Sequence, residues 1–274
     1  MKKTTVTAVI AAGLICMSLA SCTDNKNPGT TVDRAPLNST IGIQPEKAHF
    51  TFLEHNQESP LTLQSSDKQT LYISSSAEKA SFVAENRADR PSAKKINEVL
   101  TQAYGSNKKL FDSLADALDA YFSQENPDLT TFPWESKIDY SCMRNDGKAI
   151  SVLETIEMSY AGEVDNSICT SYNFDPATGD LIKQVFYSAD DKESFDSADD
   201  SMYKKLIAKY GEETISYENV SSSFVELAEE CWYFTENGIQ IIFNPGSIAP
   251  ASAGVLDLEY TAEELPELAQ KYFN

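Results

Sequence analysis

The chain has 274 residues, of which 42 are Asp or Glu and 22 are Lys or Arg, so its formal net charge at pH 7 is −20. This charge excludes proteins that hold nucleic acid or anionic lipid through broad basic patches. It favours encounter with basic partners, although solubility alone would also account for it.

The N-terminal residues have the pattern of a secretory signal peptide. Two lysines precede an apolar stretch, Val6–Ala20, which is too short for a membrane span and has no stop-transfer flank. The stretch ends in Leu19-Ala20-Ser21-Cys22, which resembles the lipobox of bacterial lipoproteins. The resemblance implies that residues 1–21 are removed and that Cys22 carries a diacylglyceryl group, which anchors the protein to the outer face of the cell membrane. An ordinary signal peptide with an incidental cysteine is the alternative.

The mature chain is more acidic still. Residues 1–21 contain two lysines and no acidic residue, so their removal leaves a net charge of −22. Residues 22–45 are rich in Thr, Pro, Asn and Gly and predict a flexible tether between the lipid and the folded part.

Residues 46–190 predict an N-terminal α+β region. Two strands, AHFTFLEH (48–55) and QTLYIS (69–74), are followed by a long polar loop over residues 74–92. Apolar residues at helical spacing then predict two helices, the first ending at Gly105 and the second capped by Ser106. From residue 138 the apolar period changes to two, and Asn145-Asp146-Gly147 predicts a hairpin.

The strand after that hairpin has one clear anomaly. It places five apolar residues on one face, interrupted only by Glu154: Ile150, Val152, Ile156, Met158 and Tyr160. Two further strands, SICTSYNF (167–174) and LIKQVFY (181–187), are joined by the turn DPATGD and continue an antiparallel meander.

Residues 191–274 predict a C-terminal domain. A helix around residues 195–210 has Phe195, Met202, Leu206 and Tyr210 on its inner side. CWYFT and IQIIF flank a second hairpin at Glu236-Asn237-Gly238, GVLDLEY is a last strand, and Thr261 with Glu264 forms a capping box for a C-terminal helix. Strands and helices come in blocks, so the chain predicts an α+β fold with an antiparallel meander sheet and packed helices.

The stretch CWYFTENGIQIIFNPGSIAPASAGVLDLEY (231–260), followed by a short acidic helix, resembles the C-terminal domain of the extracellular part of RsiV-type anti-sigma factors. In that family a hairpin leads into a P-x-x-I-A-P loop, which here reads PGSIAP (245–250). YNFDPATGDLIKQVFY (172–187) resembles the companion domain, which is also found in some membrane-anchored peptidoglycan deacetylases. The resemblance covers residues 46–274.

The resemblance implies a binding ectodomain rather than a catalyst, and the best-understood relatives bind lysozyme, a basic cell-wall hydrolase. This chain departs from them in two ways. It shows no anti-sigma domain and no transmembrane helix, so signalling across the membrane of that kind is not expected. Gly246 and Ala251 stand where the family loop often carries tyrosines, so an aromatic anchor is missing there.

Two places are candidates for partner binding. The loop 244–254 contains Pro245, Ile248 and Pro250, and its prolines and glycines suit either a rigid contact surface or a structural corner. Trp134, next to Pro133 at a helix-to-strand junction, is a candidate platform for glycan or peptide, whereas Trp232 within a hairpin strand is expected in the core.

Chemistry-bearing residues are few. Only His49 and His55 could serve a nucleophile as a base, and no nucleophile elbow, phosphate loop or His-Glu-x-x-His motif is present. The acidic run 189–201 lacks EF-hand spacing and suits solvated acids around a helix start. Cys142, Cys169 and Cys231 allow one disulfide at most, and a Cys142–Cys169 pair is conceivable. We therefore expect no catalytic residue, metal site or cofactor.

The sequence thus predicts a lipid-anchored, extracytoplasmic binding protein of the RsiV-ectodomain type, on a cell surface of the Gram-positive kind. Its expected partners are the membrane, through the lipid, and a cell-wall-associated protein or glycan, with lysozyme as the sharpest candidate; nucleic acid is not expected. The alternatives are an envelope enzyme that acts on peptidoglycan or carbohydrate through paired carboxylates and, behind it, a small-solute receptor.

Overall fold

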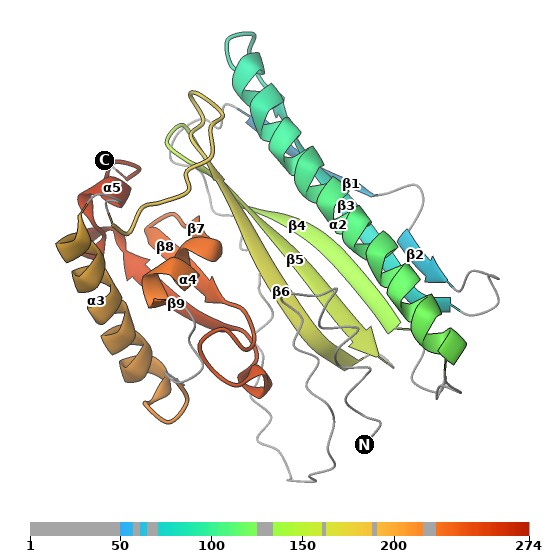
Figure 1. The fold of residues 1–274 in the computed structure, drawn as a ribbon. Coiled ribbons are helices and arrows are strands. Elements are labelled where there is room, and N and C mark those ends of the chain that lie inside the picture. The colour runs from blue at the N-terminus through green and yellow to red at the C-terminus, as the bar shows by residue number, and fades with distance from the viewer. Residues whose placement is uncertain are drawn as a thin grey trace.

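A computed structural model describes residues 50–56, 61–64, 71–124, 134–160, 163–187, 191–215 and 223–273. The expected signal peptide, Cys22, the tether and His49 lie outside these residues. Within them the chain forms a large sheet crossed by one long helix, and a small sheet with three helices beside it (Figure 1). The α+β fold that the sequence predicts is confirmed. None of the described helices combines the length and the apolar composition that crossing a bilayer requires.

The large sheet has the strand order β1-β3-β4-β5-β6, with β2 also paired to β3. Its strands are β1 (Phe50–Asn56), β2 (Leu61–Gln64), β3 (Leu71–Ala84), β4 (Trp134–Asn145), β5 (Ile150–Tyr160) and β6 (Glu163–Phe174). All pairs are antiparallel except β3 with β4, where residues 73–77 run parallel to residues 134–138. The parallel pair arises because the connection between these strands is α2 (Arg90–Gln124), a crossover rather than a hairpin.

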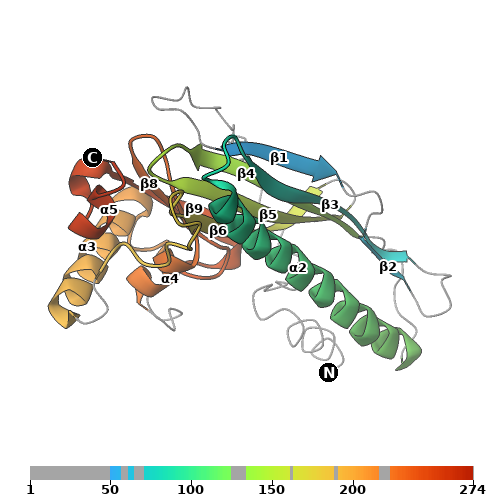
Figure 2. The ribbon, with the colours of Figure 1, turned by 90° about the horizontal axis from the view of Figure 1, so that it is seen from above.

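One face of the large sheet is covered by α2. Ile96, Leu100 and Tyr104 recur every four residues, so they form one stripe of the helix and are buried. They pack with β-strand residues that alternate along the pleat, including Phe50, Phe82, Ile138, Ile150, Val152 and Phe174. Figure 2 shows α2 running along the sheet, away from the C-terminal elements.

The small sheet has the order β7 (Trp232–Phe234), β8 (Gly238–Phe243) and β9 (Leu256–Thr261), all antiparallel. Around it lie α3 (Lys192–Tyr210), α4 (Phe224–Glu230) and α5 (Glu267–Gln270), with short 3-10 turns η3 (Ala251–Ala253) and η4 (Ala262–Glu264). Met202 and Leu206 of α3 and Phe224 and Val225 of α4 are buried against it. Gly238 is required in the hairpin, because a Cβ there would lie 1.9 Å from the carbonyl oxygen of Tyr260.

The two sheets meet through a buried polar seam. The Oγ of Ser151 accepts a hydrogen bond from Phe234 N at 3.0 Å and donates to Asn173 Oδ1 at 2.6 Å. Asn173 Nδ2 donates to Trp232 O at 2.7 Å, and Trp232 N donates to Ser171 Oγ at 2.9 Å. Side chains on the second face of the large sheet therefore satisfy the outer backbone edge of β7, which would otherwise be buried without partners.

Three local expectations are corrected. Residues 74–84 belong to β3 rather than to a polar loop, because Ala80 and Phe82 alternate inward while Lys79 and Val83 face outward. The two expected helices are one continuous helix through Gly105. Ser106 does not cap a new helix, because its Oγ donates to Gln102 O at 3.0 Å within the same helix. The segment 181–187 forms only an isolated bridge, at Leu181.

Both predicted hairpins, the predicted α3 and the Thr261–Glu264 capping box are confirmed. The capping box lies at the start of the 3-10 turn η4. The helix α5 begins separately, and Pro266 is its N-cap residue.

Candidate functional site

The loop between β8 and β9, residues 244–254, is fixed at its base by Asn244. Its Nδ2 donates to Cys169 O at 2.9 Å, and its Oδ1 accepts from Cys169 N at 2.7 Å. Gly246 and Gly254 have φ values of 84° and 74°, which only glycine adopts readily. The loop is therefore docked on strand β6 of the large sheet at a defined position.

Some residues of the loop are buried and form a structural corner, whereas others are exposed. Ile248 is 1% exposed and packs in the core of the small sheet, so it is not available as a contact. Pro245 is half-buried, while Gly246 and Pro250 are exposed. The proposed contact surface therefore reduces to the two prolines and their small neighbours, and an aspartate at position 248 would disturb folding rather than report on binding.

The other predicted candidate residues are widely separated. Trp134 begins β4, where it pairs with Ile73, but its side chain lies outside the described part of the structure. Trp232 is 1% exposed, so its expected place in the core is confirmed. His55 lies in β1 opposite Lys79.

Cys142, Cys169 and Cys231 form no disulfide with one another. Cys142 is opposite Val152 and Cys169 is opposite Thr155, on the two strands that flank β5, so the conceivable Cys142–Cys169 pair is not formed. Burial raises the pKa of the Cys169 thiol to about 11, which keeps it protonated and unreactive near neutral pH.

The acidic run before and within α3 serves the helix. Asp191 is its N-cap and accepts from the backbone N–H groups of Glu193 and Ser194, at 3.1 and 3.2 Å. Asp199 accepts from Val225 N at 3.0 Å, which joins α3 to α4. These carboxylates have structural partners that account for their positions.

The surface of the C-terminal part carries a strong negative charge. Residues 191–274 contain 17 acidic and five basic residues, a net charge of −12. Four of the five lysines form ion pairs with carboxylates of the same part: Lys192–Asp196, Lys204–Asp200, Lys205–Glu264 and Lys209–Asp257. Most of the carboxylates that are left outside these pairs are exposed to solvent.

One chemically unusual group was visible in the sequence only as a break in a pattern. Glu154 is 2% exposed in the face of β5 that α2 covers. It accepts hydrogen bonds from the hydroxyl of Tyr140 and from Asn107 Nδ2, the latter at 3.1 Å. Burial raises the pKa of Glu154, and hydrogen bonds from Tyr140, Asn107 and Tyr172 oppose that rise. Its partners come from β4, α2 and β6, so sequence spacing could not have identified them.

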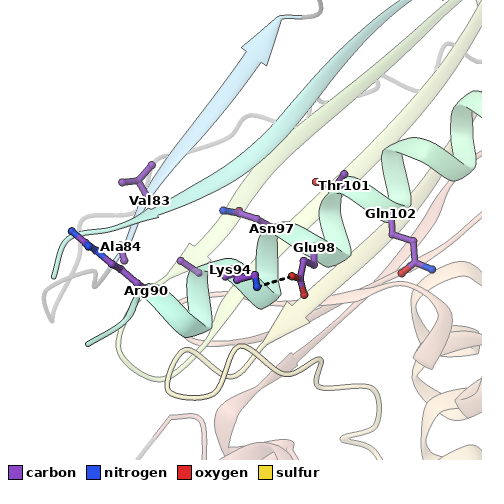
Figure 3. A pocket seen from close by; sticks show the side chains of 9 residues that line it. Val83, Ala84, Arg90, Lys94, Asn97, Glu98, Thr101 and Gln102 are labelled. Atoms are coloured by element: carbon purple, nitrogen blue, oxygen red, sulfur yellow. Dashed lines mark ion pairs between the residues drawn. The ribbon is translucent and has the colours of Figure 1, made fainter. Parts of the chain in front are cut away.

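Two hollows mark the described surface. A groove of about 720 Å³ lies between the end of β3 and the N-terminal part of α2 (Figure 3), and Glu98 is its only carboxylate. A smaller hollow of about 380 Å³ is lined by Ala262, Glu263, Gln270 and Phe273. Sequence reasoning missed the groove because residues 74–92 were expected to form a loop.

The second hollow adjoins the tightly held C-terminal end of the described chain. Arg144 Nη2 donates to Tyr272 O at 2.9 Å, and its guanidinium carbon lies 4.9 Å from the centroid of the Phe273 ring. Lys148 Nζ also donates to Phe273 O, at 3.3 Å. The wall formed by Phe273 is therefore fixed by the large sheet.

Comparison with known proteins places this geometry in context. Residues 188–259, from just before α3 into β9, match the profile of a family described as "Protein of unknown function (DUF3298)". A search of curated proteins finds no match. A crystal structure of a DUF3298 family member from Bacteroides fragilis superposes with a TM-score of 0.54 at 13% identity, covering 82% of this chain and 98% of that one. A DUF3298 family protein from Pseudomonas aeruginosa gives a TM-score of 0.49 at 11% identity, with 80% and 96% covered. Residues 188–259 thus carry the DUF3298 match, and the Bacteroides fragilis protein shares the fold.

Proposed function

We propose that this protein is a lipid-anchored, extracytoplasmic binding protein whose acidic C-terminal part, residues 191–274, engages a basic protein of the cell envelope, with lysozyme as the sharpest candidate. The observation that carries the proposal is the net charge of −12 on this part, whose lysines are largely matched by its own carboxylates. Such a field attracts a basic protein and orients it before contact.

Two exposed carboxylates are carried by adjoining segments at one end of the small sheet. Ala262 N donates to Asn237 O at 2.9 Å, so the β7–β8 hairpin, which carries Glu236, adjoins η4, which carries Glu263. Both carboxylates are exposed, and no lysine or arginine of the described residues lies within ion-pair distance of either. We take this end of the sheet as the surface to test first; the 244–254 loop with Pro250 joins the opposite ends of β8 and β9 and is not part of it.

The sequence resemblance to the RsiV ectodomain supports a partner of this class, because its relatives bind lysozyme. The lipobox resemblance supports the location, since a lipid on Cys22 would place the folded part beside the cell wall. Both arguments come from the sequence, and the charge distribution adds a physical reason for a basic partner.

The enzyme alternative is less well supported. Glycoside hydrolysis commonly needs two carboxyl groups about 5 to 9.5 Å apart across the scissile bond. The groove has one carboxylate, Glu98, whose side chain pairs with Lys94 at 3.6 Å, and the smaller hollow has one, Glu263. A small-solute receptor would need a cleft between two lobes, whereas here the two sheets are joined through Ser151 and Asn173.

The deciding experiment is calorimetric titration of residues 23–274 with a basic lysozyme at low and moderate salt. Three proteins are compared: the natural sequence, the Glu236→Lys/Glu263→Lys variant, and the control Glu85→Lys/Glu135→Lys. The control makes the same change in net charge at exposed positions of the large-sheet part.

A shaped interface predicts binding that survives moderate salt and is weakened about tenfold or more by the first variant alone. Equal loss in both variants, or heat that vanishes with salt, would mean charge attraction only and would reject lysozyme as a specific partner.

A further inference from the structure

The groove between β3 and α2 is a preformed site on the opposite, N-terminal side of the molecule. Hydrogen bonds and an ion pair fix the two elements that form its walls, β3 and α2. Asn97 of α2 is hydrogen-bonded to both the N–H and the carbonyl of Phe82 in β3, at 2.7 and 2.9 Å. The start of α2 is held to the turn that follows β6. Ser92 Oγ donates to Ala177 O at 2.9 Å, and Lys95 forms an ion pair with Asp180 at 2.8 Å. A volume of about 720 Å³ is in the range of ligand sites.

The strand wall of this groove is apolar. It consists of Val83 and Ala84 at the end of β3, and Ala93 of α2 contributes to the lining. Val83 is 50% exposed and is the one exposed large apolar side chain among those the structure describes. A ligand that covers Val83 would remove apolar surface from water, which favours binding.

The helix wall carries two cations and one carboxylate, Glu98, so it has a small net positive charge in contrast to the acidic chain as a whole. Arg90 and Lys94 line it, as Figure 3 shows, and Arg90 has no ion-pair partner among the described residues. Lys94 pairs with Glu98 at 3.6 Å, but both side chains are well exposed, so this pair is weak and can be exchanged for another.

The spacing of the two cations matches the repeat of an extended peptide. Arg90 and Lys94 are four residues apart on a helix, a rise of about 6 Å. In an extended peptide, alternate side chains point the same way and recur every ~6.8 Å, while those between them point to the opposite side. An extended peptide in the groove can therefore present acidic side chains to α2 and apolar side chains to β3.

We propose that the β3–α2 groove binds an extended peptide in which acidic residues alternate with apolar ones. A phosphate polymer would satisfy Arg90 and Lys94 but would leave Val83 and Ala84 uncovered, so the combined lining favours the peptide. This site is separate from the acidic surface proposed to bind a basic protein, and failure of either proposal leaves the other standing.

The test uses a fluorescein-labelled octapeptide of alternating Glu and Val, with fluorescence anisotropy against residues 23–274. A peptide of the same composition with four Glu followed by four Val controls for charge, and polyphosphate is the competitor. The protein variants are Arg90→Glu and Val83→Ser, with Lys183→Glu as the matched charge change at an exposed site outside the groove.

We expect Arg90→Glu to weaken the alternating peptide about tenfold or more and Val83→Ser to weaken it by a few fold, with Lys183→Glu within about twofold of the natural sequence. Circular dichroism and thermal unfolding confirm that the variants fold; both substituted groove side chains are exposed, so little change is expected.

Three outcomes would overturn the proposal. Equal binding of the alternating and block peptides would show charge attraction without a shaped site. Stronger binding of polyphosphate, lost in Arg90→Glu but kept in Val83→Ser, would make the groove a phosphate site. Self-association of the chain in analytical ultracentrifugation that disappears in Arg90→Glu would show that a second copy fills the groove.

Discussion

The side-chain carboxamide of Asn97 pairs with the backbone of Phe82 as a neighbouring strand would: Phe82 N donates to Oδ1 at 2.7 Å and Nδ2 donates to Phe82 O at 2.9 Å. Asn244 makes the same pair of bonds with Cys169, at 2.7 and 2.9 Å. In both cases an asparagine from an adjoining element completes the free edge of a strand. The first attaches α2 to β3, and the second attaches the 244–254 loop to β6.

Replacement of Asn97 by Ala is expected to lower the free energy of unfolding by about 2–4 kcal/mol, because two backbone groups of the buried Phe82 lose their partners. Urea unfolding measures the loss. Gln102→Ala is the matched control, since its side chain is exposed on the same helix, and should change stability by less than about 0.5 kcal/mol. Equal effects in the two variants would contradict the special role of Asn97.

Replacement of Asn244 by Ala is expected to release the base of the loop. The amide proton of Cys169 should then exchange with solvent faster by tenfold or more, because it loses its acceptor at an edge position (an estimate of order ~1.4 kcal/mol). Hydrogen–deuterium exchange read by NMR measures this. Amides of β9 should change little, and a uniform acceleration over the whole chain would indicate global destabilisation instead.

Replacement of Arg144 by Lys keeps the positive charge but removes the planar guanidinium group, whose several N–H groups donate in different directions. Arg144 donates to Asp146 Oδ2 at 2.7 Å and to Tyr272 O at 2.9 Å, and lies over the rings of Phe234 and Phe273. A lysine cannot make these contacts together, so we expect a loss of about 1–3 kcal/mol in thermal or urea unfolding.

The control for that variant is Lys148→Ala, which removes a single long bond to the same C-terminal segment. It should cost clearly less than Arg144→Lys. If both cost the same, the charge near the C-terminal segment, rather than the geometry of the guanidinium group, would be the stabilising feature.

Glu229 should make stability depend on pH around neutrality. Burial raises its pKa from 4.5 to about 7, although its Oε1 accepts from the N–H groups of Val185 and Phe186, at 3.0 and 3.1 Å. Since the folded chain holds this proton more tightly than the unfolded chain does, the contribution of Glu229 is fully present below pH 4.5 and is lost as pH rises to about 7.

Glu229→Gln keeps an acceptor for both N–H groups but does not titrate. Its stability relative to the natural sequence should therefore rise from pH 4.5 to pH 7 and stay constant above that, with a total change of roughly 2–3 kcal/mol. Thermal unfolding across this range gives the difference. A difference independent of pH would mean that the pKa of Glu229 is the same in the folded and the unfolded chain.

The proposed lipid anchor is tested by Cys22→Ser in cells of a lipoprotein-processing bacterium. The natural sequence should fractionate with membranes and incorporate labelled fatty acid, and the variant should do neither. If the variant remains in the membrane fraction, the anchor at Cys22 is refuted. Cys142→Ser, which leaves the lipobox unchanged, is the control.

The sequence predicts local turns well because their chemistry is local. Asn145-Asp146-Gly147 closes a hairpin through Asp146 N to Ala149 O, and Glu236-Asn237-Gly238 closes the next through Thr235 N to Gly238 O. Gly105 misled the helix prediction, because a glycine is frequent just after a helix but can also lie within one, as it does here in α2.

Features that depend on distant residues could not be predicted in the same way. Glu154 was recognisable as a break in the period of β5, but Tyr140, Asn107 and Tyr172 meet it only in the folded sheet. Ile248 carried no sign of its burial, since a loop rich in proline and glycine suits both a corner and a contact. The groove could not be predicted from the sequence, because the net charge of the whole chain is strongly negative and because residues 74–84 were expected to form a loop rather than part of β3.

The polar seam also bears on how the molecule unfolds. Each sheet has an apolar cluster of its own, and a third cluster joins Leu153 and Cys169 of the large sheet to Tyr233 and Ile242 of the small one. Ser151 and Asn173 also supply the hydrogen bonds that the β7 backbone needs at Trp232 and Phe234. If the large sheet unfolded alone, the backbone groups of Trp232 and Phe234 would lose their partners. If the small sheet unfolded alone, the side chains of Ser151 and Asn173 would lose theirs. We therefore expect the two sheets to denature together, as one cooperative unit.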